Sequence, residues 1–245
     1  MKRKLTLLFV LAGIVLTTYS QEKYAMWETM YLTPKSGKTE DLKKGMAEHN
    51  KKYHAKDPYT AHVWNIFTGK HEGEWLWAMG PCTFTDLDSR PEGEEHDKDW
   101  AENVEAYLEK SSDLRYWRLD EKLSYNPENA PMGKVIWTSY DVKDFEGYRF
   151  DEMLKKVVEV YKQKNYPNSM LVYESQFASE DGMDVVIEWS FDKWAFFDKE
   201  DKFVKDYEEI HGEGTWKHFM EEYRDIVVKA VDELAEYMPE LSGGN

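Results

Sequence analysis

The chain of 245 residues has a single cysteine, Cys82, so no internal disulfide can form. A secreted chain of this kind depends on its core or on oligomerisation for stability. Basic residues are also scarce, with 32 Lys and Arg against 48 Asp and Glu and a formal net charge of -16. This excess of negative charge excludes a nucleic acid as the main partner, because phosphate binding requires a basic surface.

Several motifs of common enzyme classes are missing. The sequence contains no G-x-G-x-x-G, Walker, G-x-S-x-G or C-x-x-C pattern, which leaves nucleotide-binding, α/β-hydrolase and thiol-redox functions without support. His49 and His54 are five residues apart and lack the spacing of H-E-x-x-H. The acidic run at 86–99 lacks the order of a calcium loop. We therefore expect no metal site.

Long apolar runs are absent except near the N-terminus, where Leu5–Leu16 forms one of twelve residues after the basic segment Lys2–Lys4. As a helix it spans about 18 Å, too short for a hydrocarbon core of about 30 Å. We predict that residues 1–20 are a signal peptide and that the protein is exported, either to the periplasm or to the medium. An uncleaved anchor is the alternative. Cleavage before Gln21 lowers the formal charge from -16 to -19, because three basic residues and no acids are lost, and leaves no membrane span.

Aromatic residues, in contrast, are abundant, with 10 Trp, 16 Tyr and 11 Phe. Each buries roughly 150–250 Å² when packed, so the chain has ample material for a core. A hydrophobic fraction of 41% also excludes a disordered chain.

The mature chain repeats itself. Residues 113–128 (DLRYWRLDEKLSYNPE) align without gaps to 225–240 (DIVVKAVDELAEYMPE), and further landmarks recur upstream in the same order. Chance similarity between two acidic, aromatic-rich halves is the alternative, but the shared order favours duplication. A period near 110 residues indicates two similar domains. We place the first at 21–128, a linker at 129–133 and the second at 134–245.

Apolar periodicity predicts the same order of elements in both halves. The expected first half is strand 26–33, helix 39–53, strands 61–67 and 74–79, helix 97–110 and strand 114–123. The expected second half is strand 135–142, helix 150–164, strands 170–177 and 183–191, helix 215–223 and strand 226–237. The last segment has a helical alternative, but its counterpart in the first half has an extended pattern. We expect 198–209 to be a mixed-charge surface segment.

This β-α-β-β-α-β order is the ferredoxin-like unit. Because one unit covers only one face of its sheet with helices, the other face needs a partner, and a fused second copy supplies it. On this order, the duplication and the Trp- and Tyr-rich strands, residues 24–241 resemble the dimeric α/β-barrel superfamily in tandem single-chain form. NIPSNAP-like, EthD-like and antibiotic-biosynthesis-monooxygenase-like proteins share that architecture. The resemblance implies an α+β fold with two tandem ferredoxin-like repeats that form an intramolecular barrel.

Strand alternation predicts a ligand site inside the barrel. The residues expected there are His62, Trp64, Trp77, Tyr140, Glu174 and Glu188. Barrel-facing His62 would be a base or an axial haem ligand, or else an ordinary hydrogen-bonded sheet histidine. Glu174 and Glu188 would form an acid/base pair if buried, or would lie at a wet barrel mouth. A filled interior, with these side chains as core, is the alternative.

The sequence thus predicts an exported protein that binds a small aromatic or amphipathic molecule or a protein partner, without a cofactor. The alternatives are a small-molecule enzyme of the cofactor-free monooxygenase or isomerase kind, a haem protein, and a structural module of the cell envelope. The ligand-binding protein and the small-molecule enzyme both imply a cavity between the sheets. The structural module implies a packed interior and an exposed apolar patch. Superfold resemblance does not choose between them, since one fold hosts many functions.

Overall fold

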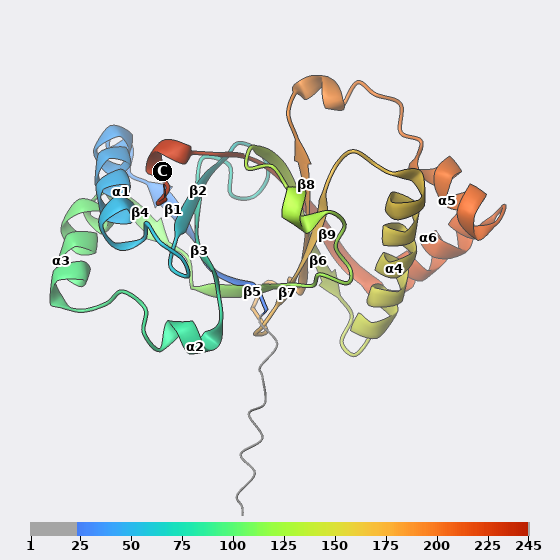
Figure 1. Ribbon diagram of the computed structural model, residues 1–245, viewed down its shortest axis with the longest axis horizontal. Helices are drawn as coiled ribbons and strands as arrows, with labels where there is room; N and C mark the ends of the chain where they lie inside the picture. Colours follow the sequence, from blue (N-terminus) through green and yellow to red (C-terminus); the bar gives the residue numbers. More distant parts are fainter. Residues whose placement is uncertain (1–23, 245) are drawn as a thin grey trace, which may run out of the picture.

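The computed structural model describes residues 24–244, so the predicted signal peptide lies outside the described residues. Nine strands form one sheet in the order β3-β2-β9-β6-β8-β7-β5-β1-β4. A further pairing of β1 with β3 closes eight of them into an antiparallel barrel (Figure 1). The strands are β1 (Met26–Pro34), β2 (Ala61–Ile66), β3 (Trp75–Cys82), β4 (Leu108–Ser111), β5 (Arg115–Leu119), β6 (Lys134–Val142), β7 (Met170–Ser175), β8 (Val185–Phe191) and β9 (Val227–Tyr237).

The two halves of the chain contribute equally to this barrel. The first half pairs its strands in the order β2-β3-β1-β5, and the second in the order β7-β8-β6-β9. In both halves, the order of neighbouring strands is therefore the same: the second strand, the third, the first and then the last strand of that half. The halves join where β2 pairs with β9 and where β5 pairs with β7. Short β4 pairs with the far end of β1, on the same edge as β5.

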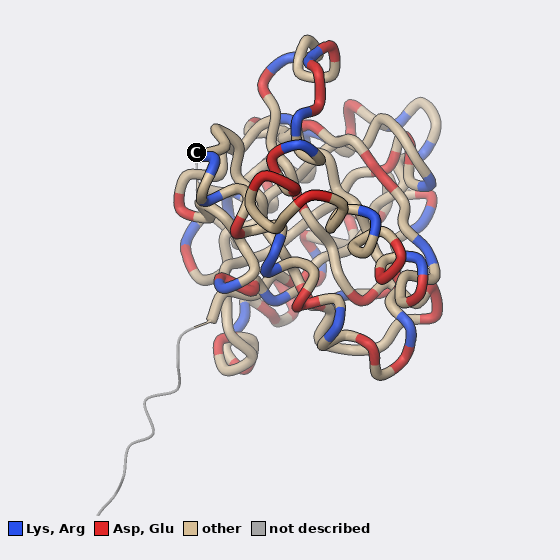
Figure 2. The backbone as a smooth tube through the Cα atoms, turned by 90° about the vertical axis from the view of Figure 1, so that its right-hand side faces the viewer, with Lys and Arg blue, Asp and Glu red and all other residues tan. Residues whose placement is uncertain are grey.

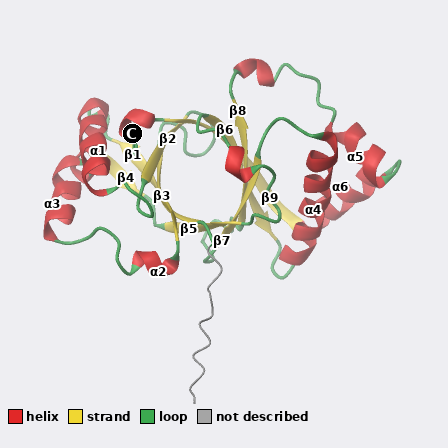
Figure 3. Cartoon of the chain, viewed as in Figure 1, coloured by secondary structure: helices red, strands yellow, loops and turns green. Residues whose placement is uncertain are grey.

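Helices cover the outside of the barrel on two opposite sides (Figures 1 and 3). Helices α1 (Thr39–Tyr53), α2 (Phe84–Leu87) and α3 (Glu94–Asn103) belong to the first half, and α4 (Gly147–Lys164), α5 (Phe203–His211) and α6 (Thr215–Ile226) to the second. One core lies under α1, with Leu42 and Met46 packed on strand residues such as Trp77. The other lies under α4, with Phe150 and Leu154 packed on β7 and β8.

Three details correct or confirm the expected elements. The helix expected at 97–110 is wrong in its second part, because α3 ends at Asn103 and 108–111 pair with β1 as β4. The mixed-charge segment 198–209 contains most of α5, whose Tyr207 is buried among aromatic rings. The extended conformation expected for 226–237 is confirmed from Val227 onwards, since β9 pairs with β6 from Val227 to Glu236, while Ile226 ends α6. The neighbouring strand β6 offers this segment a continuous row of backbone hydrogen-bond partners, which favours a strand over a helix.

Positions of Lys and Arg and of Asp and Glu are interspersed along the backbone (Figure 2). Within residues 24–244, none of the helices is long and apolar enough to cross a membrane.

Candidate functional site

The barrel encloses a cavity of about 570 Å³. Its walls are mainly apolar and include residues from all eight barrel strands of both halves. The aromatic lining residues are Trp27, Tyr31, Trp64, Trp117, Trp137 and Tyr173. A cavity of this size lies within the usual range of small-molecule sites, which are concave and mostly apolar with a few placed polar groups.

The middle of the cavity holds a row of three residues across three strands. Trp137 on β6 is in register with Glu233 on β9 and with Glu188 on β8. The Trp137 indole Nε1 donates a hydrogen bond to Glu188 Oε2 at 2.7 Å. Burial raises the pKa of Glu188, and the bond from Trp137 opposes that shift. The row therefore places a carboxyl group of reduced acidity inside an aromatic wall.

At one end of the barrel, the β2–β3 loop reaches back to Glu233. His71 Nδ1 lies 2.7 Å from Glu233 Oε1, and the His71 backbone N–H donates to the same oxygen at 3.0 Å. The Tyr31 ring stacks on the His71 ring with centroids 3.8 Å apart, and its hydroxyl donates to Glu233 Oε2 at 3.4 Å. Burial and the charge of Glu233 raise the pKa of Tyr31, which keeps its hydroxyl a donor.

Gly69 permits this close approach of loop and barrel. Its φ is +87°, and a Cβ there would lie 2.8 Å from Glu233 Cγ and 2.9 Å from the carbonyl oxygen of Asp232. A side chain would push the loop away from β9.

Basic side chains line the same end. Lys70 and Lys229 both border the cavity, are exposed, and form no ion pair with any residue that the structure describes. Arg115 is paired with Asp181 at 2.8 Å. Burial would raise the pKa of Asp181, but hydrogen bonds from Arg115 and Ser179 hold it at about 2. Two unpaired ammonium groups thus flank the cavity of an otherwise acidic protein.

At the opposite end, the cavity is bordered by His62 and Trp64 of β2 and by part of the segment 127–132. His62 Nδ1 lies 3.3 Å from the Tyr237 hydroxyl, and burial lowers the pKa of this histidine. The buried Trp64 indole Nε1 has no hydrogen-bond partner among residues 24–244. Because this nitrogen is itself buried, it is an unsatisfied donor within the cavity wall, covered by neighbouring side chains.

The structure separates the predicted site residues into two groups. His62, Trp64 and Glu188 line the cavity, whereas Trp77, Tyr140 and Glu174 do not.

The interior orientation expected for Trp77 is wrong. Trp64 is in register with Leu76 and Trp77 with Val63, one residue away from a Trp64–Trp77 pairing that would put both indoles on the same face. A shift of one residue moves every side chain to the other face. Trp77 accordingly packs under α1 and donates its indole N–H to Asn50 Oδ1 at 3.1 Å.

The interior orientation expected for Tyr140 and Glu174 is also wrong. Tyr140 packs against Phe150 of α4, on the helix side of β6. Glu174 is in register with Val185, a member of the core under α4, so it lies on the outer face of β7. Burial and the charges of Asp120 and Asp151 raise its pKa. Glu174 and Glu188 therefore lie on opposite faces of the sheet and cannot form an acid/base pair.

Sequence reasoning missed the pair of His71 and Glu233. His71 lies in a loop without periodicity, and nothing in the spacing places it near a residue 162 positions away. One signal was present, because Glu233 recurs as Glu121 in the repeat. Only the β2–β9 pairing brings the loop and the carboxylate together.

The cavity histidines differ in their fitness to hold a haem iron, which requires one free ring nitrogen and one anchored by a second-shell acceptor. His71 meets this requirement, since Glu233 anchors Nδ1 and Nε2 has no partner within the described part of the chain. His62 does not, because it bonds to the Tyr237 hydroxyl and to the backbone of Gly80.

Comparisons with known proteins show the fold. No protein-family model matches the chain, and no curated protein matches its sequence. Three similar solved structures are a monooxygenase candidate from Lactobacillus acidophilus NCFM, an anthrone oxidase-like protein, and a chlorite dismutase variant from Candidatus Nitrospira defluvii. The first is 14% identical with a TM-score of 0.55 over 90% of this chain and 96% of its own. The second is 14% identical, with a TM-score of 0.56 over 89% and 92%. The third is 11% identical, with a TM-score of 0.52 over 89% and 93%.

The chain shares its overall architecture with these proteins, which confirms the resemblance in fold expected from the element order. At these identities the likeness extends to the architecture and not to the chemistry.

Proposed function

We propose that the barrel cavity binds a small aromatic molecule that carries an anionic group. The observation that carries this proposal is the combination of an indole-rich wall with two unpaired lysines at one end of the same cavity. Aromatic walls favour a flat apolar body, and ammonium groups favour a carboxylate or phenolate.

Two further groups would orient such a ligand. The Trp64 N–H lies buried and unpartnered among the described residues, at the end opposite Lys70 and Lys229, and would donate to a neutral carbonyl or hydroxyl oxygen if binding moves the side chains that cover it. Glu188, whose pKa is raised by burial, would accept or donate a hydrogen bond near the middle. The ligand would therefore be polar at both ends and apolar between them.

The test compares 2-naphthoate with its neutral counterpart 2-naphthalenemethanol by titration calorimetry and indole fluorescence. We expect the anion to bind more tightly, and Lys70→Glu combined with Lys229→Glu to remove that preference without weakening the alcohol. Lys44→Glu is the matched control, because Lys44 is an exposed, unpaired lysine on α1, away from the cavity. If neither compound binds, and a wider panel of phenols and quinones also fails, the ligand proposal is wrong and a protein partner or a structural envelope role takes its place.

A second candidate is a cofactor-free oxygenase or isomerase acting on such a molecule. It is supported by the fold shared with a monooxygenase candidate and an anthrone oxidase-like protein, and by His71, whose Nδ1 is anchored by Glu233. An imidazole held in this way can take a proton at Nε2 while the carboxylate stabilises the charge. Oxygen consumption or proton exchange at an acidic C–H or O–H of the ligand would test this, with His71→Gln as the inactive variant and His218→Gln as control.

A haem remains the alternative cofactor. His71 is the residue that would hold its iron, and the haem would supply redox chemistry. Titration of the protein with haem, followed by the Soret band in wild type and His71→Ala, decides this. A Soret shift that persists in His71→Ala would exclude this ligand assignment.

We further propose that the two halves are tandem ferredoxin-like repeats at 21–128 and 134–245, joined by 129–133. The common element order and the common order of strand pairing support a duplication. Export by cleavage after residue 20 is likewise proposed, and intact-mass analysis of protein secreted by a Gram-negative host would test it.

A further inference from the structure

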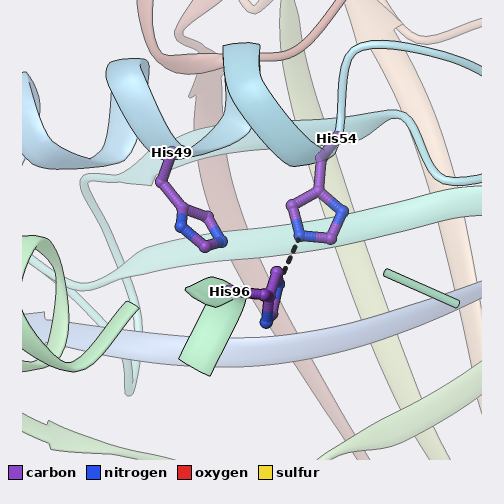
Figure 4. Close-up of side chains that lie close together, drawn as sticks. All are labelled: His49, His54 and His96. Atoms are coloured by element: carbon purple, nitrogen blue, oxygen red, sulfur yellow. Dashed lines mark hydrogen bonds between the residues drawn. The ribbon is translucent and has the colours of Figure 1, made fainter. Parts of the chain in front are cut away.

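Three histidines meet outside the barrel, between α1 and α3 (Figure 4). His49 lies on α1, His54 caps the C-terminal end of α1, and His96 lies on α3. One ligand atom from each lies within 4.8 Å of the others. The spacing of five between His49 and His54 does not suit one helical face, but His54 has left the helix, with φ -126° and ψ 38°. The third member, His96, comes from a segment more than forty residues further on.

Each imidazole is anchored through Nδ1 by an oxygen. His49 Nδ1 lies 2.8 Å from Asp99 Oδ1, His54 Nδ1 lies 3.2 Å from the Tyr59 carbonyl oxygen, and His96 Nδ1 lies 3.1 Å from Asp97 Oδ1. Carboxylate and carbonyl oxygens accept hydrogen bonds, so they place the proton of a neutral imidazole on Nδ1. The three Nε2 atoms then carry lone pairs.

These lone pairs lack a donor. His54 Nε2 and His96 Nε2 lie 3.4 Å apart with no hydrogen between them in these tautomers. His49 Nε2 is fully buried and has no hydrogen-bond partner in the described chain. A buried acceptor without a partner lowers the stability of the folded state, and a bound cation would satisfy these nitrogens.

We propose that His49, His54 and His96 bind a first-row transition-metal ion such as Zn²⁺ through their Nε2 atoms. Zinc bonds to imidazole nitrogen at about 2.0–2.1 Å, so two nitrogens of a tetrahedral site lie about 3.3–3.4 Å apart. The His54–His96 separation of 3.4 Å has this length. The Nδ1 anchors are the second shell that metal-bound histidines have as a rule.

The proposed site has three protein ligands and one open position. The His96 side chain is 14% exposed, so solvent reaches the site from the α3 side and water would complete the coordination. No residue of α3 is fully buried. A metal ion would therefore fasten α3 to α1 and stabilise a helix that the core holds weakly.

The test measures Zn²⁺ bound to the purified full chain, by equilibrium dialysis with elemental analysis and by calorimetry. We expect wild type to bind one more Zn²⁺ per chain than His96→Gln, and Co²⁺ to give visible d–d bands in wild type only. His96→Gln is the primary variant because His96 is partly exposed and its loss leaves the buried core intact. His218→Gln, an exposed histidine beside Glu221, is the control for adventitious binding and should behave as wild type.

A second variant separates the site from nonspecific binding to the acidic surface. Asp99→Asn keeps all three ligands and removes the charge behind His49, so it should weaken Zn²⁺ affinity by roughly 10- to 100-fold. Zn²⁺ should also raise the melting temperature of wild type but not that of His96→Gln. Equal stoichiometry in wild type and His96→Gln, or no Zn²⁺ bound by wild type, would overturn the proposal.

Discussion

Trp137 donates its indole N–H to Glu188 at 2.7 Å, and the two residues are also direct partners in the β6–β8 register. An indole N–H can only donate a hydrogen bond, and the cavity wall supplies the acceptor that it needs. The same contact keeps a carboxyl group inside an aromatic cavity, where burial raises its pKa. A contact that holds the cavity wall together thus involves a polar group of the proposed ligand site.

Glu188→Gln should stabilise the protein at neutral pH. Because burial raises the pKa of Glu188 in the folded state, the native protein holds a proton at a pH where the unfolded chain has released it. Stability from this group is present below the ordinary pKa of 4.5 and falls as the pH rises through the folded value. Each unit of difference contributes about 1.4 kcal/mol. Urea unfolding of wild type and variant at pH 4 and pH 7 should show a gap that grows with pH.

Exposed Glu121 is the control for this measurement, since Glu121→Gln makes the same change where no burial acts. A gap between wild type and Glu188→Gln that does not change with pH would contradict the prediction.

Trp77 and Trp64 should differ in what their loss does. Trp77 is 2% exposed under α1, so Trp77→Ala should lower the free energy of unfolding by about 3–5 kcal/mol. Trp64 borders the cavity, and Trp64→Phe keeps a ring there while removing the free N–H. We expect Trp64→Phe to cost less than about 1.5 kcal/mol and to weaken binding of any ligand that accepts from the indole. Chemical denaturation and ligand titration of both variants test this. Equal destabilisation with unchanged binding in Trp64→Phe would argue for a purely structural indole.

Gly69 and Gly73 provide a matched pair within one loop. Both have positive φ, at +87° and +82°, so alanine strains the backbone at either position, by about 1–3 kcal/mol. Only at Gly69 would the Cβ also collide with the barrel, because nothing lies within 4 Å of a Cβ at Gly73. Gly69→Ala should therefore destabilise more than Gly73→Ala and detach His71 from Glu233. Imidazole NMR shifts of His71 would report the detachment, and identical spectra in the two variants would refute it.

Asp181 should contribute stability that disappears in acid. Hydrogen bonds from Arg115 and Ser179 outweigh burial and hold its pKa at about 2, below the ordinary 3.8. The contribution is complete above pH 3.8 and is lost as the pH falls towards 2. Both members of the ion pair are partly exposed, so solvent screening limits the effect to about 1 kcal/mol or less. Asp181→Asn should thus be less stable than wild type at pH 7 and equal to it near pH 2, as measured by urea unfolding. A deficit that persists at pH 2 would point to lost packing instead.

The element order was predictable because it depends on local patterns. Apolar spacing at 39–53 and 150–164 marks the amphipathic helices α1 and α4, and turn residues mark their ends. The repeat at 113–128 and 225–240 predicted that both segments follow the same course, although the second alone has a helical alternative. The lone cysteine excluded an internal disulfide and the negative charge argued against a nucleic-acid partner without any structure.

The faces of the strands were predictable only where a polar residue marked one side. His62 on β2 and Glu188 on β8 break the apolar run, and both line the cavity. On β7 the polar residue Glu174 marks the outer face instead. Strand β3 is apolar on both faces, with Trp75 and Trp77 on one side and Leu76 and Ala78 on the other. Alternation then holds no information about which side is inner. The loop at 67–74 sets the register between β2 and β3, and this register decides which face of β3 is the inner one.

Both clusters of functional interest depend on contacts between distant segments. His71 meets Glu233 because β2 pairs with β9, and His96 meets His49 and His54 because α3 packs beside α1. Sequence spacing describes neighbours on one element, and these residues lie on different elements joined by long stretches of chain. Closure of the barrel and docking of the helices fix such distances through the packing of the whole core, which no local pattern encodes.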